Sequence, residues 1–379
     1  MEQALYHPRH GYYSSGRASL GRKGDYFTNV SVGPLFGQLL AAQFLEMWQT
    51  LGKIDNFTIV EQGAHDGAFA RDVLAAIGTG SPEFFSALRY RIIEPFRVWQ
   101  DRQQKTLEAF RDKTEWRREL SSTREVSPHL NPLSAPPGRD PGEDAQRQVR
   151  VKDLEFAGVH FSNELLDAMP VHLLVSTGSG WREKFVAVEG DKFVFVEQPI
   201  IDLALKARIS HLPAPPAGYE TEINTAVLDW IDHLSSTLTR GYALAIDYGF
   251  PRQEFYAPDR TRGTLQMREK HRHLASPFQD IGNADISAHV NWTDVAERAE
   301  AKGLRVGGFT DQHHFITGII SEHPKLIEEE KARRALQTLL HPEMLGRAFQ
   351  VLALNKDVDP ATPLAGFKFA RDAHAELGI

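Results

Sequence analysis

The sequence predicts an α/β fold in which a mostly parallel, seven-stranded sheet is covered by helices on both faces. The first observation is segment 57–74, where a β-branched apolar run is followed by Glu61, a glycine turn and an amphipathic helix. The second is segment 88–95, where another strand pattern ends in Glu94 and Pro95. One βαβ unit separates these two acidic strand ends, so we expect both at the ligand-binding edge of a parallel sheet.

The glycine turn at residues 63–67 favours a nucleoside-type cofactor without phosphates, with a purely structural turn as the alternative. It lacks one glycine of the G-x-G-x-x-G pattern that lets backbone approach a pyrophosphate, and the chain has no Gly-Lys-Ser/Thr loop. S-adenosylmethionine needs fewer such close approaches, and its cationic end tolerates an acid such as Glu61. We expect Glu94, followed by Pro95, to accept hydrogen bonds from the ribose hydroxyls.

Composition sets bounds on the class of protein. The chain has 379 residues, 41% apolar and 25% charged, which is normal for a globular protein of two or three domains or one large domain with insertions. The net charge of −7 gives no electrostatic case for nucleic acid. The absence of cysteine excludes disulfides and cysteine nucleophiles. The sequence contains no apolar run long enough to predict a membrane span and no recognisable targeting signal, so we expect a cytoplasmic protein.

The domain organisation follows from composition along the chain. Residues 1–52 form an N-terminal segment, with an aromatic, glycine-rich loop at 11–33 and a helix at 34–51. Residues 53–379 form the core. It is interrupted by a proline-rich insertion near 121–150 and by an accessory lobe near 176–240, which begins with a hairpin around Gly190.

The remaining elements of the core are weaker signals. The third strand lies near 115–120 or near 149–151, because the proline-rich insertion obscures it. We predict further strands at 157–162, 242–246, 315–318 and 349–354, and helices at 221–238 and 291–303.

An acidic motif follows the fourth strand, where Asn163-Glu164 precedes Asp167. If a helical turn begins at Glu164, the two carboxylates share a face and can bind a planar guanidinium in bidentate fashion. The same spacing also suits an acidic helix N-terminus. The spacing alone does not distinguish between these two interpretations.

The chain resembles the MidA-type family of S-adenosylmethionine-dependent methyltransferases along nearly its whole length. The motifs that carry the resemblance occur in the family's order: Leu5–Tyr13, Gly24–Thr28, Glu61–Gly67, Glu94–Pro95, Asn163–Pro170, Asp247–Gly249, Gly263–Leu265, His271 and Asp285–Val290. The resemblance implies a class I methyltransferase fold of the Rossmann-like type. Mitochondrial members are protein arginine methyltransferases that assist respiratory complex I assembly, which implies a protein substrate with an exposed arginine, and a complex I subunit as one candidate.

The resemblance also implies roles for individual residues. Glu164 and Asp167 would orient the arginine, with Asp25 or His289 assisting. Asn163, Gly63 and Gly67 would belong to the cofactor site, and no metal is expected. On local grounds Asp25 fits a turn equally well, and His289 could instead satisfy backbone groups near Asp285 and His271.

Two departures from the family pattern concern the site. His65 stands where the family usually has the middle glycine of its turn, and residues 29–31 lack the family's acid. His65 would crowd or contact the methionine part of the cofactor. The rival functions are a small-molecule methyltransferase and a non-catalytic assembly factor that retains or has lost the cofactor. The sequence does not determine the oligomeric state, so a homodimer is one of the alternatives.

Overall fold

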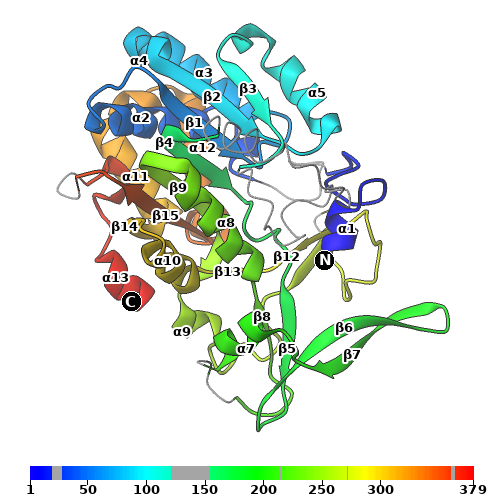
Figure 1. The fold of residues 1–379 in the computed structure, drawn as a ribbon. Helices are drawn as coiled ribbons and strands as arrows, with labels where there is room; N and C mark the ends of the chain where they lie inside the picture. The colour runs from blue at the N-terminus through cyan, green and yellow to red at the C-terminus, as the bar shows by residue number, and fades with distance from the viewer. Residues whose placement is uncertain (19–27, 121–153, 211, 213–214, 271, 360–362) are drawn as a thin grey trace, which may run out of the picture.

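The protein is described by a computed structural model as an α/β core from which a β-rich lobe projects (Figure 1). The described residues are 1–18, 28–120, 154–210, 212, 215–270, 272–359 and 363–379. The predicted proline-rich insertion, Asp25 and His271 therefore lie outside the described residues. No helix in the described ranges is both long and apolar enough to cross a lipid bilayer.

One sheet organises the core. Its strands follow the spatial order β14 (Arg305–Asp311), β15 (Phe349–Lys356), β9 (Leu238–Phe250), β4 (Phe156–Asn163), β1 (Phe57–Gln62), β2 (Leu88–Ile93) and β3 (Thr114–Arg117). The two-residue strand β13 (Val290–Asn291) pairs with β9 as an eighth member. β15 runs antiparallel to both neighbours, and the strands from β9 to β3 are parallel. The prediction of a mostly parallel α/β sheet is confirmed.

The order of the strands places the ligand-binding edge. From β1 the chain continues outward to β2 and β3, then returns to β4 on the other side of β1. In open α/β sheets, ligands bind outside the carboxyl ends of the strands where the order reverses in this way. β3 also settles the third strand in favour of the earlier of the two predicted positions.

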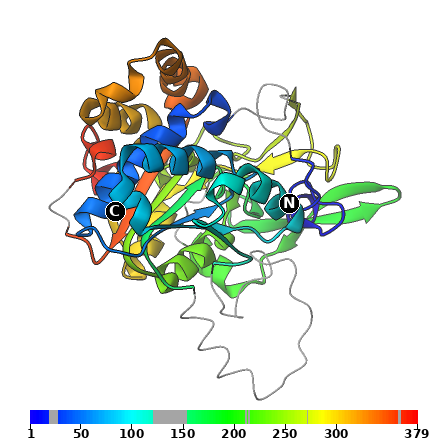
Figure 2. The same cartoon turned by 90° about the horizontal axis from the view of Figure 1, so that it is seen from above.

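Helices cover both faces of the sheet (Figures 1 and 2). One face packs against α2 (Leu35–Thr50), α3 (Ala68–Gly80) and α11 (Gln312–Glu322), and α12 (Glu330–Leu340) packs against α2 and α11. The other face packs against α8 (Thr225–Thr237), α10 (Trp292–Ala301) and α13 (Ala373–Leu377). The remaining helices are α1 (Glu2–Tyr6), α4 (Pro82–Ala87), α5 (Arg97–Thr106), α7 (Leu203–Ile209) and α9 (Arg252–Phe255). Because both faces are covered, most residues of the central strands β1, β4 and β9 are buried.

The lobe contains two small antiparallel sheets. The larger has the order β7 (Lys192–Pro199), β6 (Trp181–Glu189), β5 (His172–Ser176) and β8 (Glu220–Ile223), and the smaller has β11 (Arg272–His273), β10 (Gln266–Glu269) and β12 (Asp285–Ser287). The predicted hairpin is confirmed as β6 and β7, which extend away from the core in both views (Figures 1 and 2).

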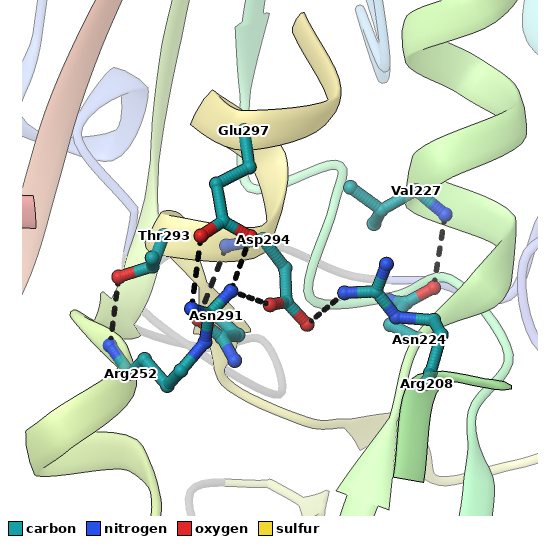
Figure 3. A network of polar contacts seen from close by, with 8 residues as sticks. All are labelled: Arg208, Asn224, Val227, Arg252, Asn291, Thr293, Asp294 and Glu297. Atoms are coloured by element: carbon teal, nitrogen blue, oxygen red, sulfur yellow. Dashed lines mark hydrogen bonds and ion pairs between the residues drawn. The ribbon is translucent and has the colours of Figure 1, made fainter. Parts of the chain in front are cut away.

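Ion pairs fasten the lobe to the core around Asp294 of α10. Its Oδ2 lies 2.6 Å from the guanidinium of Arg208 on α7, and its Oδ1 lies 2.8 Å from that of Arg252 on α9. Arg252 also pairs with Glu297, one helical turn further along α10 (Figure 3). Three elements from different parts of the chain thus share one network of charges.

Two predicted elements are wrong in position or type. The strand predicted at 315–318 is part of helix α11, whose start is capped by Asp311, since Oδ1 accepts a hydrogen bond from the backbone N–H of His314 at 2.8 Å. The strand that pairs with β15 lies upstream as β14. The helix predicted from residue 221 begins at Thr225, because the residues before it form β8.

Candidate functional site

A cavity opens at the carboxyl ends of β1, β2 and β4, beneath the N-terminal segment. Its walls combine acidic, aromatic and backbone groups: Tyr6, Tyr13, Glu61, Gly63, His65, Phe69, Glu94, Pro95, Trp99, Phe161, Asn163 and Glu164 are among its lining residues. Arginine and lysine are absent from the described residues that line it. The structure therefore brings most of the predicted site residues to one cavity.

The turn between β1 and α3 takes a left-handed backbone at three positions. Gly63 has φ of +85° and Gly67 has φ of +83°, which glycine adopts without steric cost. His65 has φ of +46°, in the same left-handed region where glycine would be favoured. The backbone of this turn therefore keeps a left-handed geometry although a side chain replaces hydrogen at residue 65.

The side chain of His65 points toward the N-terminal segment. Its ring packs against Trp99 with a centroid distance of 4.4 Å, and its Nε2 lies 3.3 Å from the backbone oxygen of Ala18. The Trp99 indole N–H in turn donates to the backbone oxygen of Tyr13 at 2.7 Å. His65 thus links the cofactor turn to the chain that covers the cavity, as well as lining the cavity itself.

Glu61 is a buried carboxyl near the end of β1. The hydroxyl of Tyr90, on the neighbouring strand β2, donates a hydrogen bond to its Oε2 at 2.7 Å. Burial raises the pKa of Glu61 to about 8, and the hydrogen bond from Tyr90 only partly opposes this. A cation bound nearby would favour the ionised carboxylate, because opposite charges attract strongly where water is excluded.

Glu94 follows β2 and is held on both oxygens. The backbone N–H of Phe96 donates to Oε1 at 2.9 Å, and the amide of Gln103 donates to Oε2 at 3.1 Å. Burial raises the pKa of Glu94 to about 7 despite these bonds. Each carboxylate oxygen has a second lone pair, so Glu94 retains the capacity to accept two hydroxyl hydrogens.

Gln103 is a positioning residue that the sequence reasoning missed. This fully buried amide on α5 donates to Glu94 and, at 2.8 Å, to the backbone oxygen of His65, while its oxygen accepts from the Trp116 indole N–H at 2.9 Å. It therefore joins the acidic end of β2 to the glycine turn. No sequence pattern distinguishes this glutamine from the other polar residues of its helix. Its hydrogen bonds agree with the rule that buried amides have their hydrogen-bonding groups satisfied.

Glu164 lies directly after β4, with its carboxyl group at the cavity. Its φ is +55°, and its backbone N–H donates to the oxygen of Ile246 on β9 at 2.9 Å. The amide of Asn163 donates to its Oε1 at 2.8 Å. Residues 164–167 form bends and a turn, so the helical turn considered for this motif is wrong.

Asp167 and Glu164 nonetheless belong to one acidic cluster, together with Asp247 and Asp285. Burial, followed by the neighbouring carboxylates, raises the pKa of both Glu164 and Asp167 well above the usual range. Burial also raises the pKa of Asp247 to about 7. In the described part of the chain, no arginine or lysine forms an ion pair with Glu164 or Asp167.

Asp247 supports the motif that follows β4. Its Oδ2 accepts hydrogen bonds from three consecutive backbone N–H groups, those of Leu165, Leu166 and Asp167, at 2.8–3.3 Å. Asp285 accepts from the hydroxyl of Tyr13 at 2.7 Å. Asp247 follows the same rule as Glu94, an acid at the carboxyl end of a parallel strand, which is the signal that could have placed it in the site.

His289 lies beside the acidic cluster but outside the cavity described above. It lines a neighbouring cavity with Glu222 and Asn291, and its ring stacks with Tyr248 at a centroid distance of 6.1 Å. Burial lowers the pKa of His289 to about 4, so the imidazole is neutral at physiological pH. Asp25 and His271, its predicted companions, lie outside the described residues. No set of three or more potential ligand side chains in the described ranges is arranged to hold a metal ion.

The donors and acceptors around the cavity fit S-adenosylmethionine. Glu94 suits a ribose diol, the turn offers backbone N–H groups, and Phe69 and Phe161 stack at 4.5 Å in the apolar wall. The cationic methionine part would lie near Glu61. A phosphate-bearing cofactor fits less well, because the described lining contains acids and lacks arginine and lysine.

Comparisons with known proteins agree with this chemistry. Over 98% of its length, the chain is 27% identical to the human protein named "Protein arginine methyltransferase NDUFAF7, mitochondrial", covering 82% of that protein. It is also 27% identical to the mouse protein of the same name, over 93% of this chain and 79% of that protein. Among solved structures, a COG1565 superfamily member from Burkholderia thailandensis, bound to S-adenosyl-homocysteine, has a TM-score of 0.81. Its sequence is 28% identical, and the match covers 99% of this chain and 90% of that one.

Residues 39–310 match the family described as "Putative S-adenosyl-L-methionine-dependent methyltransferase". That match spans the glycine turn, Glu94 and the acidic motif after β4. The chain therefore belongs to this methyltransferase family, and its cofactor is S-adenosylmethionine.

Proposed function

We propose that this protein transfers a methyl group from S-adenosylmethionine to an arginine side chain of a protein substrate. The observation that carries the proposal is the acidic cluster beside the cavity. Glu164 lines the cavity, the buried Asp167 lies close to it, and neither has a basic partner in the described part of the chain. Buried carboxylates without a cation are costly, because burial disfavours charge. An incoming guanidinium would offset that cost and could bond two carboxylate oxygens at once.

The cofactor supplies a methyl group that is already activated, so orientation is the main task of the protein. Glu164 and Asp167 would hold the guanidinium with one nitrogen directed at the methyl carbon. Correct placement of two reactants can contribute roughly 7–11 kcal/mol to lowering a barrier. Arginine stays protonated until transfer, and the proton released on methylation would pass to one of these carboxylates. Their raised pKa values make them better proton acceptors than ordinary carboxylates.

The names of the relatives support the same acceptor. The human and mouse proteins are named protein arginine methyltransferases, and the chain covers about four-fifths of each. A subunit of respiratory complex I is the first substrate to test, as the family resemblance predicts.

The experiment is transfer of an isotope-labelled methyl group into a lysate from cells that lack this protein, followed by mass spectrometry. Label on arginine residues of one protein would support the proposal. Label confined to small molecules would favour the small-molecule methyltransferase. Cofactor binding by calorimetry without any transferred label would favour a non-catalytic assembly factor.

A further inference from the structure

Three amide side chains, two of them buried, form a series of hydrogen bonds that ends at Glu164. Gln312, the first residue of α11, donates to Oδ1 of Asn29 at 2.8 Å. Asn29 donates to Oδ1 of Asn163 at 2.9 Å, and Asn163 donates to Oε1 of Glu164 at 2.8 Å. Gln312 and Asn29 are fully buried, so water does not compete for the bond between them, and Asn163 and Glu164 are partly buried. This series of hydrogen bonds joins the C-terminal half of the protein to the proposed acceptor site.

The far end of this series fixes its direction. The amide of Gln312 also donates to the backbone oxygen of Leu339 at 3.1 Å, and a backbone carbonyl can only accept. Both hydrogens of the Gln312 amide are therefore used, one toward Leu339 and one toward Asn29. Asn29 must present its oxygen to Gln312, and consequently its NH₂ group to Asn163. Asn163 then presents its own NH₂ group to Glu164.

The oxygen of Gln312 is buried and has no hydrogen-bond partner among the described residues. Leaving a buried acceptor unsatisfied is costly, and native proteins rarely do so without a reason. Turning the amide around would place this oxygen against the oxygens of Leu339 and Asn29, which is worse. The orientation seen is therefore the better of the two, and it sends a hydrogen-bond donor toward Glu164.

We propose that Gln312 is a positioning residue for methyl transfer, which acts through Asn29 and Asn163 to direct a hydrogen-bond donor at Glu164 and so favour its ionised form. The inference rests on the proposed function only in assigning Glu164 to the arginine; the titration of Glu164 itself does not depend on it. A donor aimed at the carboxyl group stabilises the carboxylate and disfavours the protonated acid.

The surroundings of Glu164 explain why such support matters. Asp247, Asp285 and Asp167 face it and all disfavour its charge. Tyr248 also lies close enough for the charge of Glu164 to raise the pKa of its hydroxyl. Burial acts in the same direction as these carboxylates. The amide of Asn163 and the backbone N–H of Asn29 are the groups that favour the carboxylate.

The first variant is Gln312→Met, which keeps the length of the side chain and removes its hydrogen bonds. Gln43→Met is the matched control, because Gln43 is an equally buried glutamine whose bonds go to Glu46 and Gly366, away from the cavity. A second variant, Gln312→Glu, reverses the series: an ionised carboxylate there accepts from Asn29, so that Asn163 turns its oxygen toward Glu164.

The titration of Glu164 is followed by carboxyl NMR on protein labelled with ¹³C-glutamate, with the signal assigned by its loss in Glu164→Gln. We expect Gln312→Met to raise the pKa of Glu164 by about one to two pH units, the effect of losing one hydrogen bond to a charged group. Gln312→Glu should raise it further, and Gln43→Met should leave it unchanged. The acid limb of the pH–rate profile for kcat should move with it.

An unchanged titration of Glu164 in both Gln312 variants would overturn the inference, even if the variants are less stable. The NMR measurement needs no acceptor substrate. Shifts in the Glu164 signal without methyl transfer to arginine would therefore support the role of Gln312 and contradict the proposed function separately.

Discussion

Tyr90 donates its hydroxyl hydrogen to Glu61 at 2.7 Å, across the parallel pair of strands β1 and β2. The bond lies at the end of the sheet where the cofactor cavity begins. Burial raises the pKa of Glu61 to about 8, so below that pH the carboxyl group is mainly protonated in the cofactor-free protein. This titration makes cofactor binding sensitive to pH.

We expect the affinity for S-adenosylmethionine to increase between pH 6 and pH 8 and to level off above. The positively charged cofactor favours the carboxylate, so its binding releases the proton of Glu61 when the pH lies below 8. Calorimetric titrations in buffers of different ionisation enthalpy would measure that proton. Glu61→Gln should remove the part of the pH dependence due to Glu61 and leave that of Glu94, whose pKa is about 7. A flat affinity profile for the unmodified protein would contradict the assignment.

Glu61 also makes the stability of the cofactor-free protein depend on pH. A carboxyl whose pKa is raised on folding stabilises the fold fully below its unfolded pKa, and this contribution is lost as the pH rises through about 8. Tm should therefore decrease from pH 5 to pH 8 more steeply in the unmodified protein than in Glu61→Gln. Saturating cofactor should reduce the difference, since it favours the ionised form.

Glu94→Gln should weaken cofactor binding by about 1.5–3 kcal/mol, because a neutral amide replaces a charged acceptor of the ribose hydroxyls. Glu222→Gln is the matched control. Glu222 is also a buried carboxyl that accepts backbone N–H bonds, from Thr264 and Leu265, but it lies outside the cofactor cavity. Calorimetry on both variants measures the effect, and equal affinities for the two would remove Glu94 from the ribose site.

Glu164→Gln should leave cofactor affinity nearly intact and reduce methyl transfer by about 10²–10³-fold, the loss typical of removing one group that stabilises charge in the transition state. Glu183→Gln, at a buried carboxyl that pairs with His172 in the lobe, is the control. Single-turnover kinetics at saturating cofactor separates the two effects. If the variant instead loses the cofactor and keeps its turnover, Glu164 belongs to the cofactor site.

His65→Gly should loosen the N-terminal cover without removing the turn. Glycine relieves the left-handed backbone at residue 65, which costs a non-glycine residue about 1–2 kcal/mol. The contacts with Trp99 and Ala18 are lost. Hydrogen exchange over residues 11–18 should become faster, at little change in Tm. His65→Asn tolerates the backbone but lacks the ring, so it should behave like His65→Gly; protection equal to the unmodified protein in both would contradict the link.

The failed strand at 315–318 illustrates what local patterns leave undecided. Phe315 and Ile316 suit a buried strand, yet with Ile319 they also follow the spacing of a helix, and all three are fully buried in α11. The strand at this place in the sheet, β14, contains Gly307 and Gly308, which are poor strand residues. Pairing with β15 selected β14, and no local signal could do so.

The candidate site shows the same division. Glu61, Gly63, Gly67 and Glu94 were predicted from their places at and after strand ends. Glu61, Gly63 and Glu94 line one cavity, and Gly67 lies in the turn beside it. Gln103, Asn29 and Gln312 were not, because an amide reveals its role only through the partner it meets, and these partners are distant in sequence.

The sequence by itself determined the elements whose signals are local: strands of β-branched residues, glycine turns and the acids that follow strands. These depend on backbone geometry and on burial of one segment, which a few neighbouring residues decide. The tertiary structure alone decided which acids meet, as Glu164 and Asp167 do with Asp247, and which amides orient them. That outcome depends on bringing together residues eighty or more positions apart, and on burial that makes each unpaired charge costly.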